Sequence, residues 1–320
     1  MKKYLPLWLK APLAVLKTEF KKWPAGLVCA HMLRAFAESG GCEKKGKQRV
    51  WHYVQDQTYR YLSKHYGHRV ENQNCTLGEK AEGTPVWIFW WQGEQTAPTL
   101  VQQCIQSIRR QAGNRPVHVV DQHNYHDFVM IPDHIERKRE SGIISLTHFS
   151  DFLRMALLAR HGGLWLDATI FASAPLDTCF EGDLFTVRNP GFEKENISRW
   201  EWSVFAIGGN AGCSLFVQVR DLLSAYWEDN DRLVDYYVFD YMVRLVVDNC
   251  PGIQNALESV EPNNPNTYFY QQHFNDTADL LPPDDTWLYK LSWKGTYNTI
   301  TPAGEETVYG RWLRETENPI

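Results

Sequence analysis

Residues 148–170 read HFSDFLRMALLARHGGLWLDATI, and they contain a helix, a break and a strand in direct succession. Apolar side chains lie on almost every side of the stretch 150–161, which predicts a buried helix. The Gly-Gly pair that follows ends this helix. The apolar run 164–166 is typical of a buried strand, and Asp167 comes directly after it. We therefore expect a helix followed by a buried strand, with Asp167 at the carboxyl end of that strand.

The same alternation of strand and helix begins earlier in the chain. Residues 85–91, PVWIFWW, form an apolar run rich in strand formers, and helical spacing follows at 98–111. A second short strand is expected at 117–120. This alternation predicts an α/β fold with a mostly parallel sheet flanked by helices. Because open parallel sheets bind ligands beyond the carboxyl ends of their strands, we expect one site around residues 90–93, Asp121 and 167–169.

Composition and charge divide the chain into two parts. The 320 residues are 43% hydrophobic and 22% charged, which is ordinary for a globular protein and excludes disordered, collagen-like and coiled-coil classes. Residues 1–50 carry a net charge of +8, so the other 270 residues carry −13 of the overall −5. The acidic body argues against nucleic acid as a partner. We expect a basic helical segment at 1–83 and a globular α/β unit at 84–320.

The first 23 residues, MKKYLPLWLKAPLAVLKTEFKKW, mix Leu, Trp and Phe with lysine. Lys10 and Pro12 interrupt the apolar stretch, so neither secretion nor a membrane span is expected. Two interpretations remain open. In one, the segment lies in a membrane interface and makes peripheral contact, with Trp8 and Trp23 beside lysines. In the other, it belongs to a helical hairpin that packs on the body and keeps its lysines in water.

Seven cysteines are scattered along the chain, without a C-x-x-C pair or a Cys/His cluster of zinc spacing. The simplest interpretation is that they are reduced thiols of a cytoplasmic protein. The predicted location is therefore cytoplasmic, and the inner face of the cell membrane is the place where the basic segment would attach.

Two charges stand on the predicted buried helix. Asp151 and Arg154 are three residues apart and share a helix face, and a buried charge needs a partner. One interpretation is an internal ion pair with Ser150 as the helix cap. The other assigns Arg154 to a phosphate group and Asp151 to a ribose or sugar hydroxyl.

Asp167 is a candidate metal ligand. A carboxylate at the end of a buried strand suits Mg²⁺ or Mn²⁺ that bridges a diphosphate, because these cations prefer oxygen ligands. The alternative is that a strand-terminal Asp caps the next turn.

Taken together, these motifs resemble those of the bacterial capsular polysaccharide synthesis proteins, which are relatives of the DXD-containing glycosyltransferase family 32. The similarity rests on HFSDFLR (148–154), HGGLWLDATI (161–170), WWQGEQTAP (90–98) and IPDHI (131–135). It extends more loosely to DYYVFDY (235–241) and KLSWK (290–294), so that it covers roughly residues 84–300. The resemblance implies a GT-A-like fold for the unit 84–320, a nucleotide-sugar donor, a divalent cation and retention of anomeric configuration.

The resemblance also implies roles for single residues. Trp90 matches an aromatic residue that stacks on the donor base, and Asp151 and Arg154 match a carboxylate that holds the sugar or ribose and the arginine near it. Asp167 matches the first Asp of the DXD, but Thr169 stands in its third position. The predicted metal ligands are thus Asp167 and Thr169, with water or a downstream carboxylate, unless metal dependence is reduced. The predicted donor-binding residues are Trp90, Gln92, Gly93, Ser150, Asp151, Arg154, Thr169 and Lys294.

The C-terminal half carries weaker candidates. Asp240, in an aromatic stretch, is expected to face the reacting sugar, which makes Asp151, Asp167 and Asp240 the predicted catalytic carboxylates. Asp235 is more simply interpreted as a helix cap. Lys294 could close over the diphosphate as a mobile charge, and a solvated lysine after a late strand explains it equally well.

The resemblance therefore predicts a hexosyltransferase that moves a sugar from a UDP- or GDP-linked donor to a capsular or surface glycan, or to a lipid-linked glycan. Two alternatives stay open: a non-catalytic sugar-binding component of a polysaccharide assembly complex, and a metal-dependent phosphohydrolase. The hydrolase would want a further Asp at position 169, where Thr stands. The sequence contains no P-loop or dinucleotide-binding motif.

Overall fold

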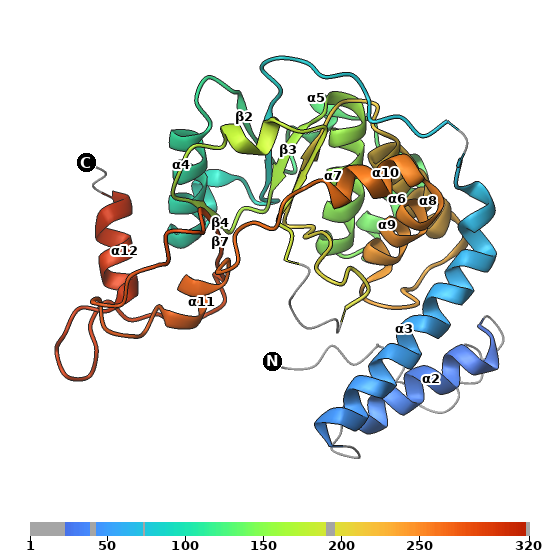
Figure 1. The fold of residues 1–320 in the computed structure, drawn as a ribbon, viewed down its shortest axis with the longest axis horizontal. Helices are drawn as coiled ribbons and strands as arrows, with labels where there is room; N and C mark the ends of the chain where they lie inside the picture. Colours follow the sequence, from blue (N-terminus) through green and yellow to red (C-terminus); the bar gives the residue numbers. More distant parts are fainter. Residues whose placement is uncertain (1–22, 39–42, 73, 190–195, 318–320) are drawn as a thin grey trace.

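A five-stranded sheet lies at the centre of the computed structural model, which describes residues 23–38, 43–72, 74–189 and 196–317 (Figure 1). The strand order is β2-β1-β3-β6-β5. β1 pairs in parallel with β2 and β3, whereas β6 is antiparallel to β3 and to β5. The bounds are β1 (Val86–Phe89), β2 (Val117–Val120), β3 (Gly163–Leu166), β5 (Leu184–Thr186) and β6 (Ala206–Gly209). The predicted α/β class is confirmed, and the three strands indicated by the sequence form the parallel half of the sheet.

A second, two-stranded sheet continues the chain directly after β3. It pairs β4 (Ile170–Ala172) with β7 (Leu288–Lys290) in antiparallel register, so that Ile170 lies opposite Lys290. The connection from β3 to β4 consists of three residues, 167–169. A segment near the C-terminus of the chain is thereby placed beside Asp167.

Helices cover the central sheet on both sides (Figure 1). One layer holds α4 (Thr99–Gln111) and α12 (Val308–Glu317), and the other is built mainly from α7 (Leu146–His161), α8 (Ser214–Asp229) and α9 (Val238–Asn249). The shorter helices are α5 (Tyr125–Phe128), α6 (Asp133–Glu140), α10 (Pro251–Glu258) and α11 (Phe269–His273). Successive strand residues enter opposite cores, as Trp165 and Leu166 do, because strand side chains alternate in direction.

Helix α7 begins four residues earlier than the sequence pattern predicts. Ser145 is its N-cap, and the Ser145 side chain accepts a hydrogen bond from the backbone N–H of His148. Ser150 therefore lies inside the helix, and its predicted role as a cap is wrong. The first two residues of the helix, Leu146 and Thr147, are exposed, and the buried pattern begins only at His148. The predicted end is confirmed, since Gly162 caps the helix with a φ of 64°.

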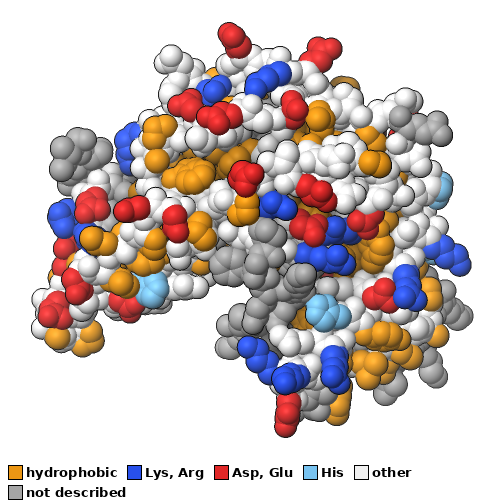
Figure 2. Space-filling model, in the orientation of Figure 1, with side chains coloured by type: hydrophobic (Ala, Val, Ile, Leu, Met, Phe, Trp, Pro, Cys, Tyr) orange, Lys and Arg blue, Asp and Glu red, His pale blue; other side chains and the backbone are white. Residues whose placement is uncertain are grey.

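Two N-terminal helices form a hairpin that extends from the body (Figure 1). They are α2 (Ala25–Phe36) and α3 (Lys44–Tyr66), and Arg34 Nη1 on α2 lies 2.9 Å from Asp235 Oδ2 in the body. Asp235 also accepts a hydrogen bond from the backbone N–H of Tyr237, so it anchors the hairpin as well as the start of α9. Lys and Arg side chains gather at the far end of the hairpin, where α3 begins with KKGKQR (Figure 2). The division of the chain at residue 83 stays a prediction.

Trp23 corrects the membrane interpretation at one position. The sequence suggested that Trp23 lies at a membrane surface, but its side chain is buried in the larger apolar core with Leu27. Residues 1–22, the rest of that segment, lie outside the described residues. Among the residues that are described, no helix combines the length and the apolar character that a membrane crossing needs.

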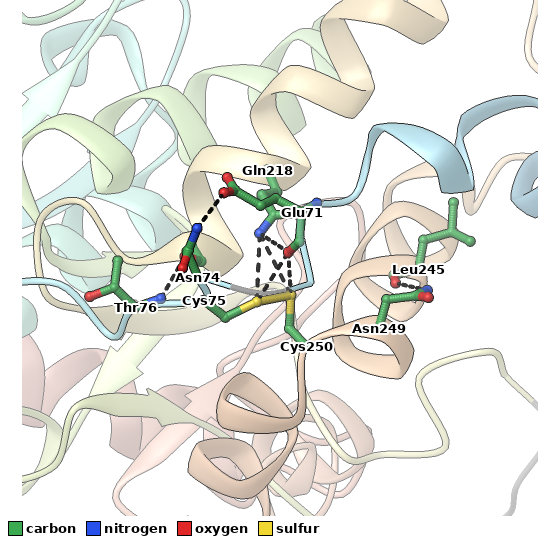
Figure 3. Close-up of a disulfide and its surroundings, with 9 residues drawn as sticks. Glu71, Asn74, Cys75, Thr76, Gln218, Leu245, Asn249 and Cys250 are labelled. Atoms are coloured by element: carbon green, nitrogen blue, oxygen red, sulfur yellow. Dashed lines mark hydrogen bonds between the residues drawn. A yellow bond between two sulfur atoms is a disulfide. The ribbon is translucent and has the colours of Figure 1, made fainter.

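A disulfide joins Cys75 to Cys250, which corrects the prediction that the cysteines are all reduced (Figure 3). The two residues are 175 positions apart, with Cα atoms 6.0 Å from each other. No local spacing could indicate this pair, because only the fold brings the linker before β1 to the start of α10. Disulfides are typical of oxidising compartments, so the cysteines no longer support a cytoplasmic location, which stays a prediction.

The start of β3 allows no side chain on Gly163. Its φ is +93°, and a Cβ atom would stand 2.1 Å from the carbonyl oxygen of Pro85, which accepts the hydrogen bond of Leu164 N–H. Gly113 also has a positive φ, of +61°, but nothing lies within 4 Å of its Cβ position. Alanine at Gly163 would meet both a backbone clash and an unfavourable φ, whereas alanine at Gly113 would meet only the unfavourable φ.

We expect Gly163→Ala to lower the free energy of unfolding by roughly 3 kcal/mol or more, because the sheet must separate to admit the methyl group. Gly113→Ala should cost only about 1–2 kcal/mol, which is the penalty of the left-handed backbone. Urea denaturation followed by tryptophan fluorescence measures both. Equal losses in the two variants would show that the close approach to Pro85 is unimportant.

Candidate active site

The loops after the three parallel strands meet at one edge of the sheet. Trp90 follows β1, and its backbone N–H donates to Val120 O at the end of β2 over 3.0 Å. A Cβ atom on Gly93 would stand 3.3 Å from Asp121 Oδ2, so this glycine lets the two loops approach. Asp167 leaves β3 at the same edge. The expectation that residues after these strands lie around one edge is met, as the parallel pairing requires.

Asp151, Arg154 and Asp167 form a charged cluster between α7 and β3. Arg154 Nη1 donates to Asp151 Oδ1 over 2.8 Å, and its Nη2 lies 3.5 Å from Asp167 Oδ1. The Arg154 side chain is only 4% exposed and lies against the rings of Trp165 and Phe239. It therefore stands behind the two carboxylates and orients them. The ion pair expected as one interpretation of this helix is present.

Lys290 completes the cluster from the second sheet. Its Nζ donates to Asp167 Oδ2 over 2.6 Å and to Thr169 Oγ1 over 2.9 Å. This contact follows from the β4–β7 register, which places Lys290 opposite Ile170. Trp165 Nε1 donates to the other oxygen of Asp167 over 3.0 Å. Both oxygens of this carboxylate are thus held by donors.

These donors stabilise the ionised form of Asp167. Burial acts to raise the pKa of this carboxyl, but the charges of Lys290 and Arg154, together with the hydrogen bonds from Lys290 and Trp165, outweigh it and lower the pKa to about 2. Asp167 is therefore a carboxylate at all physiological pH values. Its side chain remains 28% exposed, so solvent or a ligand can reach one edge of the ion pair.

Asp240, in the first turn of α9, has a raised pKa, in contrast to Asp167. Trp202 Nε1 donates to Asp240 Oδ1 over 2.9 Å. Burial raises the pKa of Asp240 to about 7, and the negative charge of Asp151 adds to the rise, while the Trp202 hydrogen bond and Arg154 oppose it. The effect of the Asp151 charge on the pKa of Asp240 places these two predicted residues in one electrostatic neighbourhood. A carboxyl with this pKa is divided between its neutral and ionised forms near neutral pH.

The predicted metal ligands do not fit a divalent cation in this arrangement. Asp167 Oδ2 and Thr169 Oγ1, the two oxygens assigned to the metal, both accept hydrogen bonds from Lys290 Nζ. Ca²⁺, Mg²⁺ and Mn²⁺ sites need several oxygen ligands. In the part of the chain that the structure describes, no group of three or more His, Cys, Asp or Glu residues is placed to hold a metal ion.

Two tryptophans meet beside the charged cluster. Trp90 and Trp293 pack edge to face with ring centroids 5.7 Å apart, and Trp293 is 45% exposed. Leu291 N–H donates to Thr169 O over 2.9 Å, so the segment 290–293 runs from the charged cluster to the tryptophan pair. Trp90 Nε1 is buried and has no hydrogen-bond partner within the described residues.

The remaining predicted residues are Gln92, Ser150 and Lys294. Gln92 is exposed in the turn after β1, and Ser150 is half-buried within α7. Lys294 is exposed, and its Nζ lies 5.7 Å from the ring centroid of Trp293. The lysine that contacts Asp167 is Lys290, from the same KLSWK motif. Sequence reasoning missed Lys290 because the pairing of β7 with β4 leaves no local signal. It missed Trp202 because Trp202 and its partner Asp240 are 38 positions apart.

The fold and the charged edge define an α/β protein with a site at the carboxyl ends of parallel strands. A family model described as capsular polysaccharide synthesis protein matches residues 41–311. Since this match covers most of the chain, the protein belongs to the capsular polysaccharide synthesis protein family. The further relation to glycosyltransferase family 32 stays a prediction.

Two curated relatives share short segments with the chain. The O-glycosyltransferase PaGT of Phomopsis amygdali is 32% identical over 91 residues, which are 26% of this chain and 22% of the relative. The O-glycosyltransferase braB of Annulohypoxylon truncatum is 30% identical over 95 residues, or 27% and 23% of the two chains. The chain therefore spans less than a quarter of the length of these relatives.

Two solved structures are similar at low sequence identity. The PaToxG glycosyltransferase has a TM-score of 0.38 and 11% identity, over 66% of this chain and 80% of that one. The WbbM bifunctional glycosyltransferase has a TM-score of 0.42 and 12% identity, over 78% and 52%.

The pKa of Asp240 predicts a pH-dependent stability difference. Because the folded-state pKa lies above the ordinary value of 3.8, ionisation of Asp240 costs stability, and the cost grows as the pH rises from about 4 to about 7. Asp240→Asn keeps an acceptor for Trp202 and removes the charge. Its melting temperature relative to wild type should rise by about 2 °C or more between pH 5 and pH 8.

Differential scanning calorimetry of both proteins checks this expectation, with Asp284→Asn as the control for an exposed carboxyl. The control should show little pH dependence of this kind. A constant difference between wild type and Asp240→Asn at all pH values would contradict the raised pKa.

Proposed function

We propose that this protein is a glycosyltransferase that moves a hexose from a nucleoside diphosphate sugar to a capsular or surface glycan. Membership of the capsular polysaccharide synthesis family supports the proposal. The observation that carries it is the charged cluster of Asp151, Arg154, Asp167 and Lys290 at the carboxyl edge of the sheet, beside two tryptophans. Charges of both signs next to aromatic rings suit a donor that combines a diphosphate, a sugar and a base.

Each part of the donor has a matching group. The half-buried Trp90 and the exposed Trp293 offer aromatic surface to a nucleotide base. Gln92 and Gly93 lie in the turn after β1, close to Trp90 in the chain. Asp151 Oδ1 accepts a hydrogen bond from Arg154, whereas Asp151 Oδ2 accepts none from the described residues. We assign that oxygen to a hydroxyl of the ribose or of the transferred sugar.

The reaction is a substitution at the anomeric carbon. The bond from this carbon to the diphosphate oxygen breaks, the acceptor oxygen bonds to the same carbon, and the proton of the acceptor hydroxyl goes to the departing diphosphate. Attack from the face that the diphosphate leaves would retain the configuration. Asp240 is proposed to face the sugar next to Asp151, where its neutral form can donate a hydrogen bond to a sugar oxygen.

The divalent cation expected from the sequence is not part of this mechanism, since Lys290 Nζ lies between the oxygens that would bind it. A UDP- or GDP-linked sugar is proposed as the donor, and a glycan or lipid-linked glycan as the acceptor. The basic segment 1–22 is proposed to make peripheral contact with an anionic membrane, which would hold the protein near a lipid-linked acceptor.

Nucleotide release tests the transferase proposal. Purified protein is incubated with UDP-, GDP-, CMP- and dTDP-sugars, and we expect release from one donor class, increased by a glycan acceptor. Asp151→Asn should lower the rate by about 10- to 100-fold, because a hydrogen bond to a charged group contributes about 1.5–3 kcal/mol. The exposed Asp284→Asn is the matched control and should leave the rate unchanged.

Other outcomes favour the alternatives. Binding of a sugar or donor without release would favour a non-catalytic sugar-binding component. Phosphate release from simple monoesters would favour a phosphohydrolase. No release from any donor, with or without acceptor, would refute the transferase proposal.

Membrane contact is tested separately by co-sedimentation with phosphatidylglycerol vesicles. The full-length protein with Lys10→Glu and Lys17→Glu should bind at least about 10-fold more weakly, because each lysine near an anionic surface contributes about 1 kcal/mol. A full-length control with Arg110→Glu and Arg160→Glu makes the same charge change in the body. Equal weakening of both proteins would remove the N-terminal attachment from the proposal.

A further inference from the structure

Lys290 is the one cation in the described part of the site that combines a fixed position with access to solvent. Its side chain is 21% exposed, whereas that of Arg154 is 4% exposed. The backbone N–H of Lys290 donates to Thr267 O over 2.7 Å, and β7 holds the residue in register with β4. The ammonium group therefore belongs to the framework of the site, unlike that of a lysine on a flexible loop.

The position of this ammonium group coincides with the position predicted for a metal ion. Asp167 Oδ2 and Thr169 Oγ1 are the oxygens that the sequence assigns to the cation, and both bind Lys290 Nζ, at 2.6 and 2.9 Å. A divalent cation could use this pair of oxygens only by displacing Lys290. Displacement would separate a partly buried ammonium group from its carboxylate, which costs free energy.

Lys290 also retains a donor for a ligand. A lysine ammonium group has three N–H donors, and within the described residues two of them are used, by Asp167 and Thr169. Its other close neighbour is the ring of Phe205, whose centroid lies 5.7 Å from Nζ and which offers no oxygen acceptor. The remaining N–H is free to bind an oxygen that carries negative charge.

Resting on the transferase function proposed above, we propose that the Lys290 ammonium group replaces the divalent cation and holds the donor diphosphate through its remaining N–H. When the bond between sugar and diphosphate breaks, the electron pair stays on the phosphate oxygen, where Lys290 stabilises the charge. Lys290 keeps its own protons, because the acceptor hydroxyl supplies the proton that the diphosphate takes up. Arg154 acts as a positioning residue behind Asp151 and Asp167.

Calorimetric titration tests the binding half of this inference. The full-length protein is titrated with UDP, GDP and dTDP and with the corresponding nucleosides, in EDTA and then in Mn²⁺. The diphosphate that binds should do so with affinities equal to within about twofold in the two buffers. Lys290→Met should weaken diphosphate binding by about 10- to 100-fold and leave nucleoside binding unchanged, a selectivity that general structural damage would not produce.

Lys80→Met is the matched control. Lys80 Nζ donates to Glu181 O, and the neighbouring Glu79 pairs with Ala211. Ala211 follows the end of β6, and this end of β6 lies opposite the start of β3. This lysine is thus at the far end of β3 from Asp167, and its loss should change neither affinity. Thermal melts verify that Lys290→Met is folded.

Nucleotide release tests the catalytic half. With the donor found above, wild-type rates should be equal in EDTA and in Mn²⁺, and this measurement does not depend on any variant. Lys290→Met should lower kcat by at least about 100-fold, as expected when a group that stabilises transition-state charge is removed. Lys290→Arg, which keeps the charge, should recover part of the loss.

The two proposals fail in different ways. Diphosphate binding or turnover that requires Mn²⁺, or normal diphosphate binding by Lys290→Met, would overturn the role of Lys290 and leave the transferase standing. Release of nucleotide from no donor in either buffer would overturn the transferase itself, and with it the catalytic role of Lys290.

Discussion

The carboxylate of Asp167 is the constraint on which the rest of the site depends. It stands at the end of a buried strand, where an ionised group must be paired to be tolerated. Trp165, Arg154 and Lys290 supply that pairing from β3, α7 and β7. The Asp167 carboxylate thus connects the central sheet, the buried helix α7 and the late strand β7. The same three partners lower the pKa of Asp167 to about 2.

The pairing of buried charges also links the N-terminal hairpin to the body. Arg34 and Asp235 join the N-terminal hairpin to the start of α9, a few residues before Asp240. Asp240 has no cation in direct contact among the described residues, and burial raises its pKa to about 7. Paired Asp167 and unpaired Asp240 therefore divide the roles that carboxylates can play: one anchors a cation, and the other can carry a proton near neutral pH.

Much of the fold was predictable, and the errors have local causes. The stretch 148–170 indicates helix, break and strand correctly, because burial on all sides leaves an unbroken apolar pattern. The start of α7 was misplaced because its cap, Ser145, precedes two exposed residues that lie outside the buried pattern. Trp23 looks like a membrane anchor from its lysine neighbours, yet it is buried in the core. Neighbours in sequence do not reveal which side of a residue faces the protein.

The sequence by itself determined the α/β class, the parallel strands and the pairing of Asp151 with Arg154, because these depend on apolar periodicity and on residues three positions apart. Only the tertiary structure decided that Lys290 and not Lys294 contacts Asp167, and that Cys75 meets Cys250. Those contacts join residues 123 and 175 positions apart. Their positions follow from strand register and helix packing, which depend on the whole core and leave no trace in local spacing.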